Sequence, residues 1–418
     1  MHSDSLHRLT KSILDSGEAS SIEEALEIFS QYGVHVLLGK DIKSSPAAQV
    51  IALTVINTAA RSFLGNVTVD SEDFNLSAPG FEGWTLCDFM KWAGINENIS
   101  MVKPRWPRIS IGAVETSDSI VPWANGWRFG LGTSNGMGKF FAPACVAAGG
   151  LAVSEAFSLL RQDNPYAGRR HLELSLWDPK DGASEPTESA FTPPPGGLWL
   201  VGVGHLGQAY CWTLGFMAPG KLPLYVQDVD LVTQSTLSTS ILCTPGDVGI
   251  RKTRVAARWL EERGYNVSLV ERRFNEHLRL GPDEPAIALF GVDNPAARRA
   301  IEAVGFRLVV DAGLGAGYRD FRGIRIRTFP GPSKAAQLWA EGGQDGEIVM
   351  APAYQKLLDQ GAEPCGITTL ATRAVGAPFV GCVAAAYVIA EHVRRQCGGQ
   401  GVGYLDLNLR DPARLDAG

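Results

Sequence analysis

Residues 198–228 read LWLVGVGHLGQAYCWTLGFMAPGKLPLYVQD, and this stretch decides the fold. Its first apolar run, Leu198 to Val201, predicts a buried parallel strand. A second strand is expected at Leu224–Gln227, which would complete the start of a Rossmann-like unit. Between them lie three glycines whose spacing lets backbone N–H groups approach a phosphate at a helix start: Gly202, Gly204 and Gly207.

Charged residues suited to a nucleotide follow this stretch. Asp228 lies 21 residues (228 − 207) beyond the last glycine, about where a carboxylate meets a ribose, and Asp230 is two residues further on. Lys252 comes later, and Asp293 and Asn294 follow a third apolar run. A nicotinamide oxidoreductase would fit the glycines but has no use for a lysine and a magnesium-type aspartate around a phosphate. The pattern therefore favours an enzyme that cleaves ATP.

Composition and charge narrow the classes of function. The chain has 418 residues, a length typical of two or three domains. Its net charge of −6, with basic residues scattered along the chain, argues against a nucleic-acid partner. The seven cysteines form no CxxC pair and the seven histidines no HxxxH pair, which disfavours a disulfide scaffold and a transition-metal site. We expect a reduced, cytoplasmic protein.

Membrane signals are weak throughout the sequence. The N-terminal residues are polar, unlike those of a signal peptide. The two most apolar helical stretches, residues 142–160 and 377–394, contain Glu155 and Glu391, so neither offers roughly 18 uncharged apolar residues. We therefore expect no membrane partner.

The chain repeats itself. Residues 141–160 and 377–395 both begin with Ala-Pro within their first three residues and share the string Cys-Val-Ala-Ala, and each is followed by an LxLxLxDP strand at 171–179 or 404–412. We expect an α/β fold of two Rossmann-like units in tandem, at residues 1–180 and 197–418, joined by a polar, proline-rich linker at 181–196.

The first unit lacks the chemistry of the second. Its opening strand, Val34–Leu38, runs into a helix expected at 47–62, but only Gly39 stands where three glycines should be. Nothing in it matches Lys252 or Asp293. We interpret it as an inactive copy that completes a pseudo-dimer.

The second unit resembles the ThiF/MoeB/E1 superfamily, whose members adenylate ubiquitin-like and sulfur-carrier proteins. Residues 228–252 follow that family's pattern from Asp-x-Asp to Gly-x-x-Lys without a gap, and Asp293-Asn294 with Arg298 resembles its Asp-Asn-x-x-x-Arg. A chain that fuses a half without these motifs to a half that carries them is similar to the E1-like proteins of bacterial ubiquitin-like conjugation (Bil-type) operons, which are associated with antiphage defence.

The resemblance implies ATP and Mg²⁺ as cofactors and assigns roles to the motif residues. The three glycines would form the phosphate loop, with Asn294 also at the nucleotide. Asp228 would bind the ribose with Asp230 in support, Lys252 would contact the phosphates, and Asp293 would hold Mg²⁺. An alternative for Asp293 is a helix N-cap.

Two positions depart from the family pattern. Its asparagine falls on Thr236 and its phosphate-binding arginine on Thr239, so one positive charge is lost. Arg251 or Arg254 could substitute. Many E1 enzymes also receive an arginine from the N-terminus of the inactive half, and Arg8 is the candidate here.

Cys365 is the predicted nucleophile. It lies among polar residues and glycine in a short insert at about 330–376, just before the late helix, where E1 enzymes carry their catalytic cysteine. The alternative is an inert loop cysteine. Cysteines inside apolar helices are expected in the core, and His205 is expected to be a partly exposed loop residue. The core cysteines are Cys145, Cys211 and Cys382.

These assignments imply an E1-like activating enzyme. It would adenylate the C-terminus of a ubiquitin-like protein, form a thioester on Cys365 and transfer the protein to an E2-like partner. One alternative is a sulfur-carrier or peptide adenylyltransferase that makes no such transfer. Another is a non-catalytic scaffold that keeps the fold, which the departures at Thr236 and Thr239 would favour.

Overall fold

The computed structural model describes residues 6–95, 105–114, 118–132, 137–180, 185, 197–217, 222–340, 351–359, 368 and 371–418. The elements of the first half, up to residue 180, are α1 Thr10–Asp15, α2 Ile22–Ser30, β1 Gly33–Leu38, η2 Lys40–Ser44, α3 Pro46–Ser62, β2 Asn66–Asp70, α4 Leu86–Trp92, β3 Arg108–Ile111, β4 Pro122–Asn125, β5 Arg128–Leu131, α5 Ala142–Arg161 and β6 Leu172–Ser175.

The elements of the second half, from residue 197, are β7 Leu198–Val201, α6 His205–Leu214, β8 Pro223–Gln227, η3 Gln234–Ser238, η4 Pro245–Asp247, α7 Lys252–Glu261, β9 Asn266–Val270, β10 Ile287–Phe290, α8 Pro295–Arg299, η5 Ile301–Ala303, β11 Leu308–Leu314, β12 Gly323–Phe329, α9 Ala335–Leu338, α10 Pro352–Asp359, α12 Pro378–Gln396, β13 Tyr404–Asn408 and β14 Asp416–Ala417.

The second half is built on one eight-stranded sheet in the order β14-β13-β12-β11-β10-β7-β8-β9. Strands β9, β8, β7, β10 and β11 are parallel, and β12 to β14 continue antiparallel. Strand β7 has the predicted bounds, and β8 begins one residue earlier than predicted.

The apolar run of β7 follows from burial on both of its faces. Leu198 and Leu200 belong to the large core that includes α6 and α12, whereas Trp199 and Val201 pack in a second core with Phe290 and residues of α8. Because side chains alternate along a strand, both alternating sets are apolar when both faces are covered.

The first half repeats this order in two smaller sheets. Parallel strands β2-β1-β3 form one sheet, antiparallel β4-β5-β6 form another, and a single parallel bridge between Ile109 and Ile120 connects their edges. The arrangement β8-β7-β10 followed by β11-β12-β13 in the second half has the same sequence of parallel and antiparallel neighbours. The described structure is therefore a tandem α/β pair, as the repeated strings predict.

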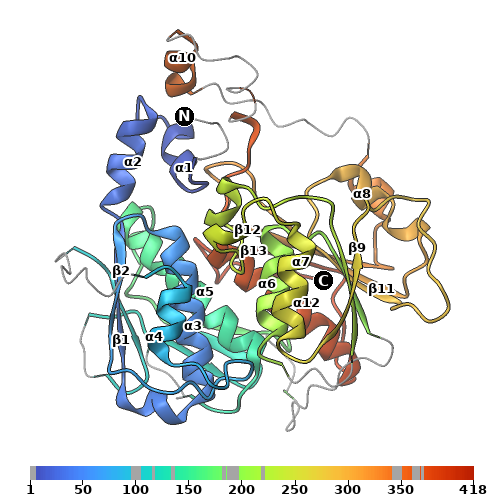
Figure 1. The fold of residues 1–418 in the computed structure, drawn as a ribbon, viewed down its shortest axis with the longest axis horizontal. Coiled ribbons are helices and arrows are strands. Elements are labelled where there is room, and N and C mark those ends of the chain that lie inside the picture. The colour runs from blue at the N-terminus through green and yellow to red at the C-terminus, as the bar shows by residue number, and fades with distance from the viewer. Residues whose placement is uncertain are drawn as a thin grey trace.

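Two helices rich in small residues join the halves. Helix α5 packs against α12, with α3 and α6 flanking the pair (Figure 1). A Cβ atom added at Gly150 would lie 2.7 Å from the carbonyl oxygen of Phe379, so only glycine permits this approach. Within the described residues, α5 is long and apolar enough to cross a membrane by length and composition, but most of it is buried inside the protein, between α12 and elements of its own half.

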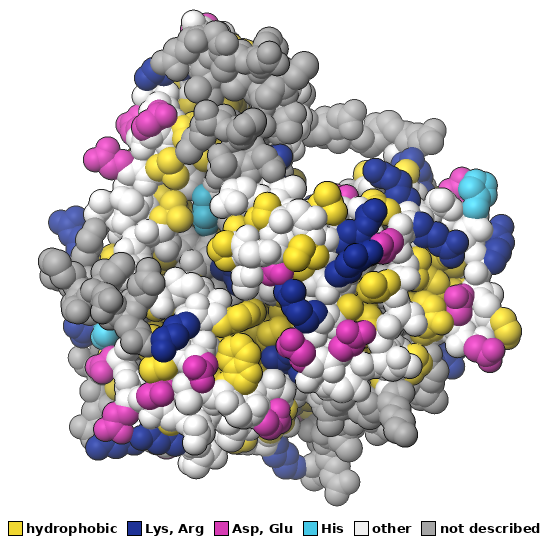
Figure 2. All heavy atoms as spheres, viewed as in Figure 1, with side chains coloured by type: hydrophobic (Ala, Val, Ile, Leu, Met, Phe, Trp, Pro, Cys, Tyr) yellow, Lys and Arg dark blue, Asp and Glu magenta, His cyan; other side chains and the backbone are white. Residues whose placement is uncertain are grey.

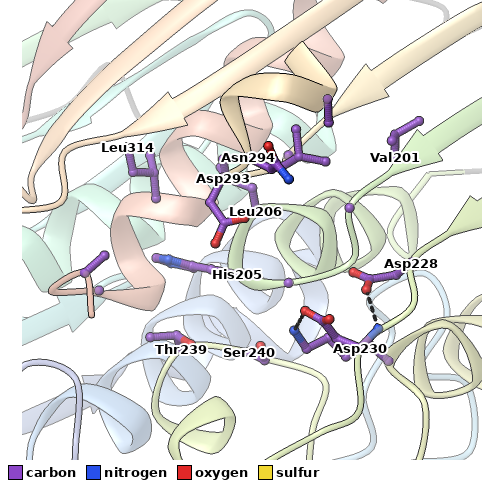
Figure 3. Close-up of a pocket in the computed structure, with 18 of the residues that line it drawn as sticks. Val201, His205, Leu206, Asp228, Asp230, Thr239, Ser240, Asp293, Asn294 and Leu314 are labelled. Carbon is purple, nitrogen blue, oxygen red and sulfur yellow. Dashed lines mark hydrogen bonds and ion pairs between the residues drawn. The ribbon is translucent and has the colours of Figure 1, made fainter. Parts of the chain in front are cut away.

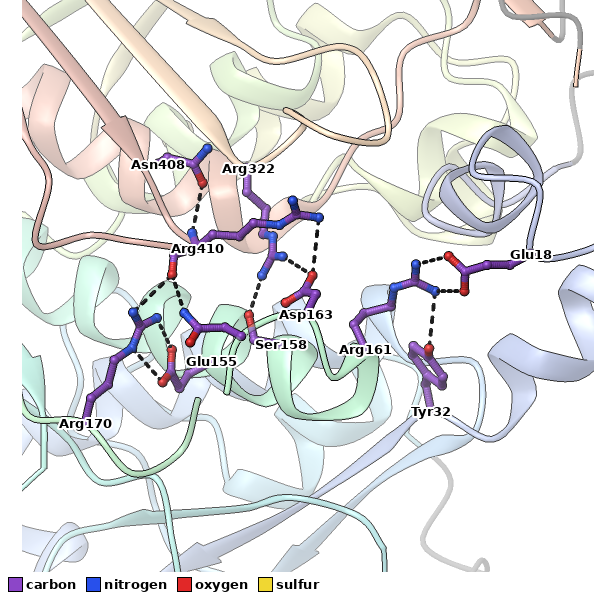
Figure 4. A network of polar contacts seen from close by, with 11 residues as sticks. Glu18, Tyr32, Glu155, Ser158, Arg161, Asp163, Arg170, Arg322, Asn408 and Arg410 are labelled. Carbon is purple, nitrogen blue, oxygen red and sulfur yellow. Dashed lines mark hydrogen bonds and ion pairs between the residues drawn. The ribbon is translucent and has the colours of Figure 1, made fainter. Parts of the chain in front are cut away.

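A polar network closes one end of the same interface (Figure 4). Arg322 of the second half donates to Ser158 and pairs with Asp163 of the first half. In the opposite direction, Arg170 pairs with the buried Glu155 and donates to the carbonyl oxygen of Arg410 at 3.0 Å. Each half thus supplies an arginine that donates a hydrogen bond to the other half.

The predicted insert at 330–376 contributes helices α9 and α10. Helix α10 lies beside α1 (Figure 1), and Tyr354 donates from Oη to Asp15 Oδ1 at 2.7 Å. Lys11 pairs with the same carboxylate of Asp15. The insert is therefore attached to the N-terminal helix of the first half. Cys365 and most of the predicted linker lie outside the described residues.

Candidate active site

A cavity of about 440 Å³ opens at the carboxyl ends of β7, β8 and β10 (Figure 3). This is the edge at which open α/β sheets bind their ligands. Seven residues predicted from the sequence line it: Gly202, Gly204, Asp228, Asp230, Lys252, Asp293 and Asn294.

The glycine loop forms the floor of the cavity. Gly202 has a φ of +84°, which favours glycine, and α6 begins directly after Gly204. Gly207 does not line the cavity; a Cβ atom there would lie 2.0 Å from the carbonyl oxygen of Gly202. Gly207 therefore lets α6 pack against the loop. The first N–H groups of the helix, which have no acceptor within it, are available to an anion.

Asp228 is fixed by the backbone at the end of β8. Its Oδ2 accepts a hydrogen bond from the N–H of Val203 at 2.6 Å, and its Oδ1 accepts one from the N–H of Asp230 at 2.8 Å. Each carboxylate oxygen can accept a further bond. Asp228 is thus oriented by the glycine loop and can still receive hydroxyl groups of a ribose.

Lys252 is the first residue of α7. Its backbone N–H donates to the carbonyl oxygen of Asp230 at 3.0 Å, and its Nζ lies 2.9 Å from Asp230 Oδ2. The lysine side chain is 14% exposed and that of Asp230 is 60% exposed. Since a half-solvated ion pair is weak, an anion in the cavity could share this ammonium group.

Asn294, and not Asp293, caps helix α8. Asn294 Oδ1 accepts from the N–H of Ala296 at 2.8 Å. The alternative interpretation of Asp293 as the cap is therefore wrong, because the cap belongs to its neighbour. The Asp293 carboxylate points into the cavity, opposite Thr239 and Ser240 (Figure 3).

Residues that could hold Mg²⁺ are few. No group of three or more His, Cys, Asp or Glu side chains lies close enough to enclose a metal within the part of the chain that the structure describes. Mg²⁺ commonly keeps several waters and binds through one or two carboxylates plus phosphate oxygens. Asp293, whose carboxylate faces into the cavity, could serve as such a Mg²⁺ ligand.

An arginine of the first half reaches the cavity. Arg8 lines the wall, donates from Nη1 to the carbonyl oxygen of Ala374 at 3.1 Å, and donates from its backbone N–H to Ser238 Oγ at 3.3 Å. Arg8 is the residue that the sequence analysis named for this purpose, and the structure places it at the site.

The two suggested substitutes for the missing arginine lie elsewhere. Basic side chains gather on this face of the second half with acidic ones among them (Figure 2). Arg251 and Arg254 place their Nε atoms 3.3 Å and 3.0 Å from the carboxylate of Glu271, and neither lines the cavity. The suggestion that they replace the charge lost at Thr239 is therefore wrong.

Arg272 and Arg273 also line the cavity, although no motif in the sequence predicts a site role for them. These residues follow β9 at the same carboxyl edge of the sheet, and that position was the signal that could have identified them. Arg298 also lines the cavity, donating to Asp311 at 3.2 Å and to the carbonyl oxygen of Ala312 at 2.9 Å. Burial raises the pKa of Asp311 to about 6, although Arg298 opposes that shift.

His205 and the two threonines complete the wall. His205 begins α6 and is half-buried, and burial lowers its pKa to about 4, so the ring is neutral at pH 7. Thr236 Oγ1 accepts from the N–H of Thr233 at 3.0 Å, and Thr239 Oγ1 donates to the carbonyl oxygen of Thr236 at 3.4 Å. Both hydroxyls are thus used mainly to shape their own loop.

The described cysteines include no exposed thiol at the cavity. Cys145, Cys211 and Cys382 are fully buried, as predicted, and burial raises the pKa of each thiol. Cys243 is also buried, with its Sγ 3.0 Å from Gln208 Nε2. The predicted role of Cys365 stays a prediction because that residue is outside the described part.

A second cavity of about 570 Å³ adjoins the first. It lies over β11, β12 and β13. Three of its polar wall residues are Arg325, Arg327 and Asp406. The two cavities have four wall residues in common: Arg298, Leu314, Gly315 and Ala316. They therefore meet at the end of β11.

Comparisons with known proteins identify relatives of the whole chain. A family model described as the BilD N-terminal domain matches residues 33–176, and one described as the BilD C-terminal domain matches residues 194–399. A bacterial E1-like protein BilD of Collimonas sp. (strain OK412) is 39% identical over 434 aligned residues, covering 96% of this chain and 90% of that protein.

Solved structures give a more distant likeness. The crystal structure of E. coli MccB aligns with a TM-score of 0.36 and 16% identity, covering 53% of this chain and 61% of that chain. A crystal structure of MccB with ATP aligns with a TM-score of 0.34 and 16% identity, over 53% and 63% of the two chains. This chain spans less than two thirds of MccB, and a likeness at this level carries no argument about function.

Proposed function

We propose that this chain, which belongs to the BilD family of bacterial E1-like proteins, uses ATP to adenylate the C-terminal carboxylate of a ubiquitin-like protein. One observation carries the proposal: Asp228, Lys252 and Asp293 line a single cavity above a glycine loop. The first half would be inactive, supplying packing and Arg8 to the active second half.

The proposed reaction begins with attack on phosphorus. An oxygen of the substrate carboxylate bonds to the α-phosphorus of ATP, the bond from that phosphorus to the bridging oxygen breaks, and pyrophosphate leaves with the electron pair. The product is an acyl-adenylate, in which AMP is a good leaving group.

The side chains of the cavity would offset the meeting of two anions. Lys252 and Arg8 place positive charge in the wall, and the N-terminus of α6 offers N–H groups to phosphate oxygens. Asp228 would hold the ribose. Asp293 would hold Mg²⁺, which neutralises phosphate charge when bound.

The adjoining second cavity would receive the segment that precedes the substrate carboxylate. The two cavities share a wall at Leu314, Gly315 and Ala316. A protein C-terminus could thus lie over β11 and β12 and end in the nucleotide cavity.

A second step would move the acyl group to sulfur. The thiolate of Cys365 would attack the acyl carbon of the adenylate, the bond from that carbon to the phosphate oxygen would break, and AMP would leave. The resulting thioester would then pass to an E2-like partner.

ATP–pyrophosphate exchange with the substrate protein and the Cys365→Ser variant tests the scheme. We expect exchange to persist in the variant while the thiol-sensitive adduct between the two proteins disappears. Exchange without any such adduct in the unaltered chain would favour a sulfur-carrier or peptide adenylyltransferase. No ATP binding at all would favour the scaffold that the threonines at 236 and 239 leave open.

A further inference from the structure

We propose that Arg61, on α3 of the first half, is a positioning residue that holds the nucleotide loop of the second half in place. This inference rests on the proposed function, because it takes ATP to be the ligand of the cavity. The loop in question is defined as residues 231–246, between β8 and α7.

The Arg61 side chain donates hydrogen bonds to backbone carbonyl groups of this loop. Its Nη1 donates to the carbonyl oxygen of Leu237 at 3.3 Å, and its Nη2 donates to that of Ile241 at 3.2 Å. These two residues bracket Thr239 and Ser240, which line the cavity. The guanidinium group therefore fixes both ends of the segment that would face the phosphates.

A second side chain of α3 supports the same grip. Asn57, one helical turn before Arg61, accepts from Arg61 Nε at 2.9 Å on Oδ1 and donates from Nδ2 to the carbonyl oxygen of Ile241 at 3.1 Å. The planar, forked guanidinium suits this arrangement, because its donors leave in fixed directions and an ammonium group cannot reproduce them.

Arg61 also holds the segment that carries Arg8. The carbonyl oxygen of Arg61 accepts from His7 Nε2 at 2.8 Å, and Arg8 is the next residue along the chain. Burial lowers the pKa of His7 to about 4, so the ring is neutral at pH 7 and its Nε2 carries the proton in this contact. One residue of the first half thus connects two walls of the cavity.

The charge of the loop explains why such support is needed. Residues 231–246 contain no Lys, Arg, Asp or Glu, so the loop itself offers no cation to a polyphosphate. Arg61 lies half-buried behind it, and within the described residues none of its hydrogen bonds goes to a carboxylate. Its positive charge is offset by two carbonyl groups of the loop, by Asn57 Oδ1, and by the Trp92 ring, whose centroid lies 6.0 Å from the Arg61 Cζ atom.

Two further groups, Asp247 and Cys243, lie close enough to Arg61 to affect its pKa. Asp247 lies near enough to favour its charge, but that carboxylate pairs with Arg258 at 2.7 Å. Burial lowers the pKa of Arg61 to about 10, which still leaves it charged at pH 7. The first half lacks the nucleotide-binding motifs of the second half. Through Arg61 it nevertheless orders the loop at 231–246 and adds positive charge behind it.

Calorimetric titration of the full chain with MgATP tests the inference. We expect Arg61→Gln to bind MgATP about tenfold more weakly, which corresponds to about 1.4 kcal/mol of binding free energy, because a loop that is no longer held must be ordered when the nucleotide binds. Arg61→Lys keeps the positive charge but not the forked guanidinium group. Its affinity for MgATP should therefore lie between that of Arg61→Gln and that of the unaltered chain.

Arg170→Gln is the matched control. Arg170 also lies in the first half and donates to a carbonyl oxygen of the second half, at Arg410, but it lines neither cavity. The control should lose stability and keep its MgATP affinity. Amide hydrogen exchange within residues 233–241 should quicken in Arg61→Gln and stay unchanged in the control.

The outcomes separate this inference from the proposed function. If the unaltered chain binds no MgATP, both are overturned. If it binds MgATP and Arg61→Gln binds equally well with unchanged exchange in the loop, only the role of Arg61 is overturned. Should Arg61→Gln fail to fold, Asn57→Ala decides instead: a several-fold loss of affinity supports the grip, and unchanged affinity refutes it.

Discussion

Replacing Lys252 with alanine should separate catalysis from stability more sharply than any other single change in the cavity. The only described partner of the Lys252 ammonium is Asp230 at 2.9 Å, whose side chain is 60% exposed. This ion pair is open to solvent on the Asp230 side, and such pairs contribute about 0.2–1 kcal/mol, so losing it should lower the free energy of unfolding by no more than about 1 kcal/mol.

The expected effect on the reaction is much larger. A positive group that stabilises developing charge in a water-poor site is worth about 3–4 kcal/mol, which corresponds to a rate loss of about 10²–10³. Because the Lys252 side chain contributes little to folding, the variant should lose most of its reaction rate while its free energy of unfolding hardly changes.

ATP–pyrophosphate exchange with the substrate protein measures the first quantity, and urea unfolding measures the second. Arg254→Ala is the control, because Arg254 lies on the same helix two residues away, pairs with Glu271 and does not line the cavity. The reasoning is refuted if Lys252→Ala exchanges within a few-fold of the unaltered chain, or if Arg254→Ala slows exchange as much.

Three further changes test other parts of the structure. Asp293→Asn should slow pyrophosphate exchange about 10²-fold with little change in thermal midpoint, since Asn294 caps α8; an unchanged rate would exclude a metal-holding role. Gly207→Ala should weaken MgATP binding in calorimetry, because its Cβ atom would lie 2.0 Å from the Gly202 carbonyl oxygen, and normal affinity would contradict that packing. Burial lowers the pKa of His392 from 6.5 to about 4. The neutral imidazole therefore contributes its full share to the free energy of unfolding above pH 6.5, and this contribution is lost as the pH falls toward 4. The loss is about 3 kcal/mol, and urea midpoints between pH 7 and 5 should fall less steeply for His392→Leu.

The strands and helices that place the site could be predicted because their signals are local. An apolar run buried on both faces, followed by three spaced glycines, specified β7 and the start of α6. The shared Cys-Val-Ala-Ala strings located α5 and α12 for the same reason. These patterns depend on a few adjacent residues.

The remaining site residues depend on tertiary contacts. Arg61 and Leu237 are 176 residues apart in the chain, and no periodicity or motif connects them. Asp293 and Asn294 are both good helix caps, so only the structure could show which one is used. Arg251 and Arg254 were plausible cavity cations by sequence position, yet Glu271 holds both of them elsewhere.

The close approach of α5 and α12 at Gly150 has a consequence for dissecting this protein. Each half presents an apolar helix that its counterpart covers. Fragments produced separately should therefore precipitate, whereas fragments synthesised in the same cell should find each other and restore the intact particle. The covalent link between the halves would then fix their ratio, with one copy of the second half for every copy of the first.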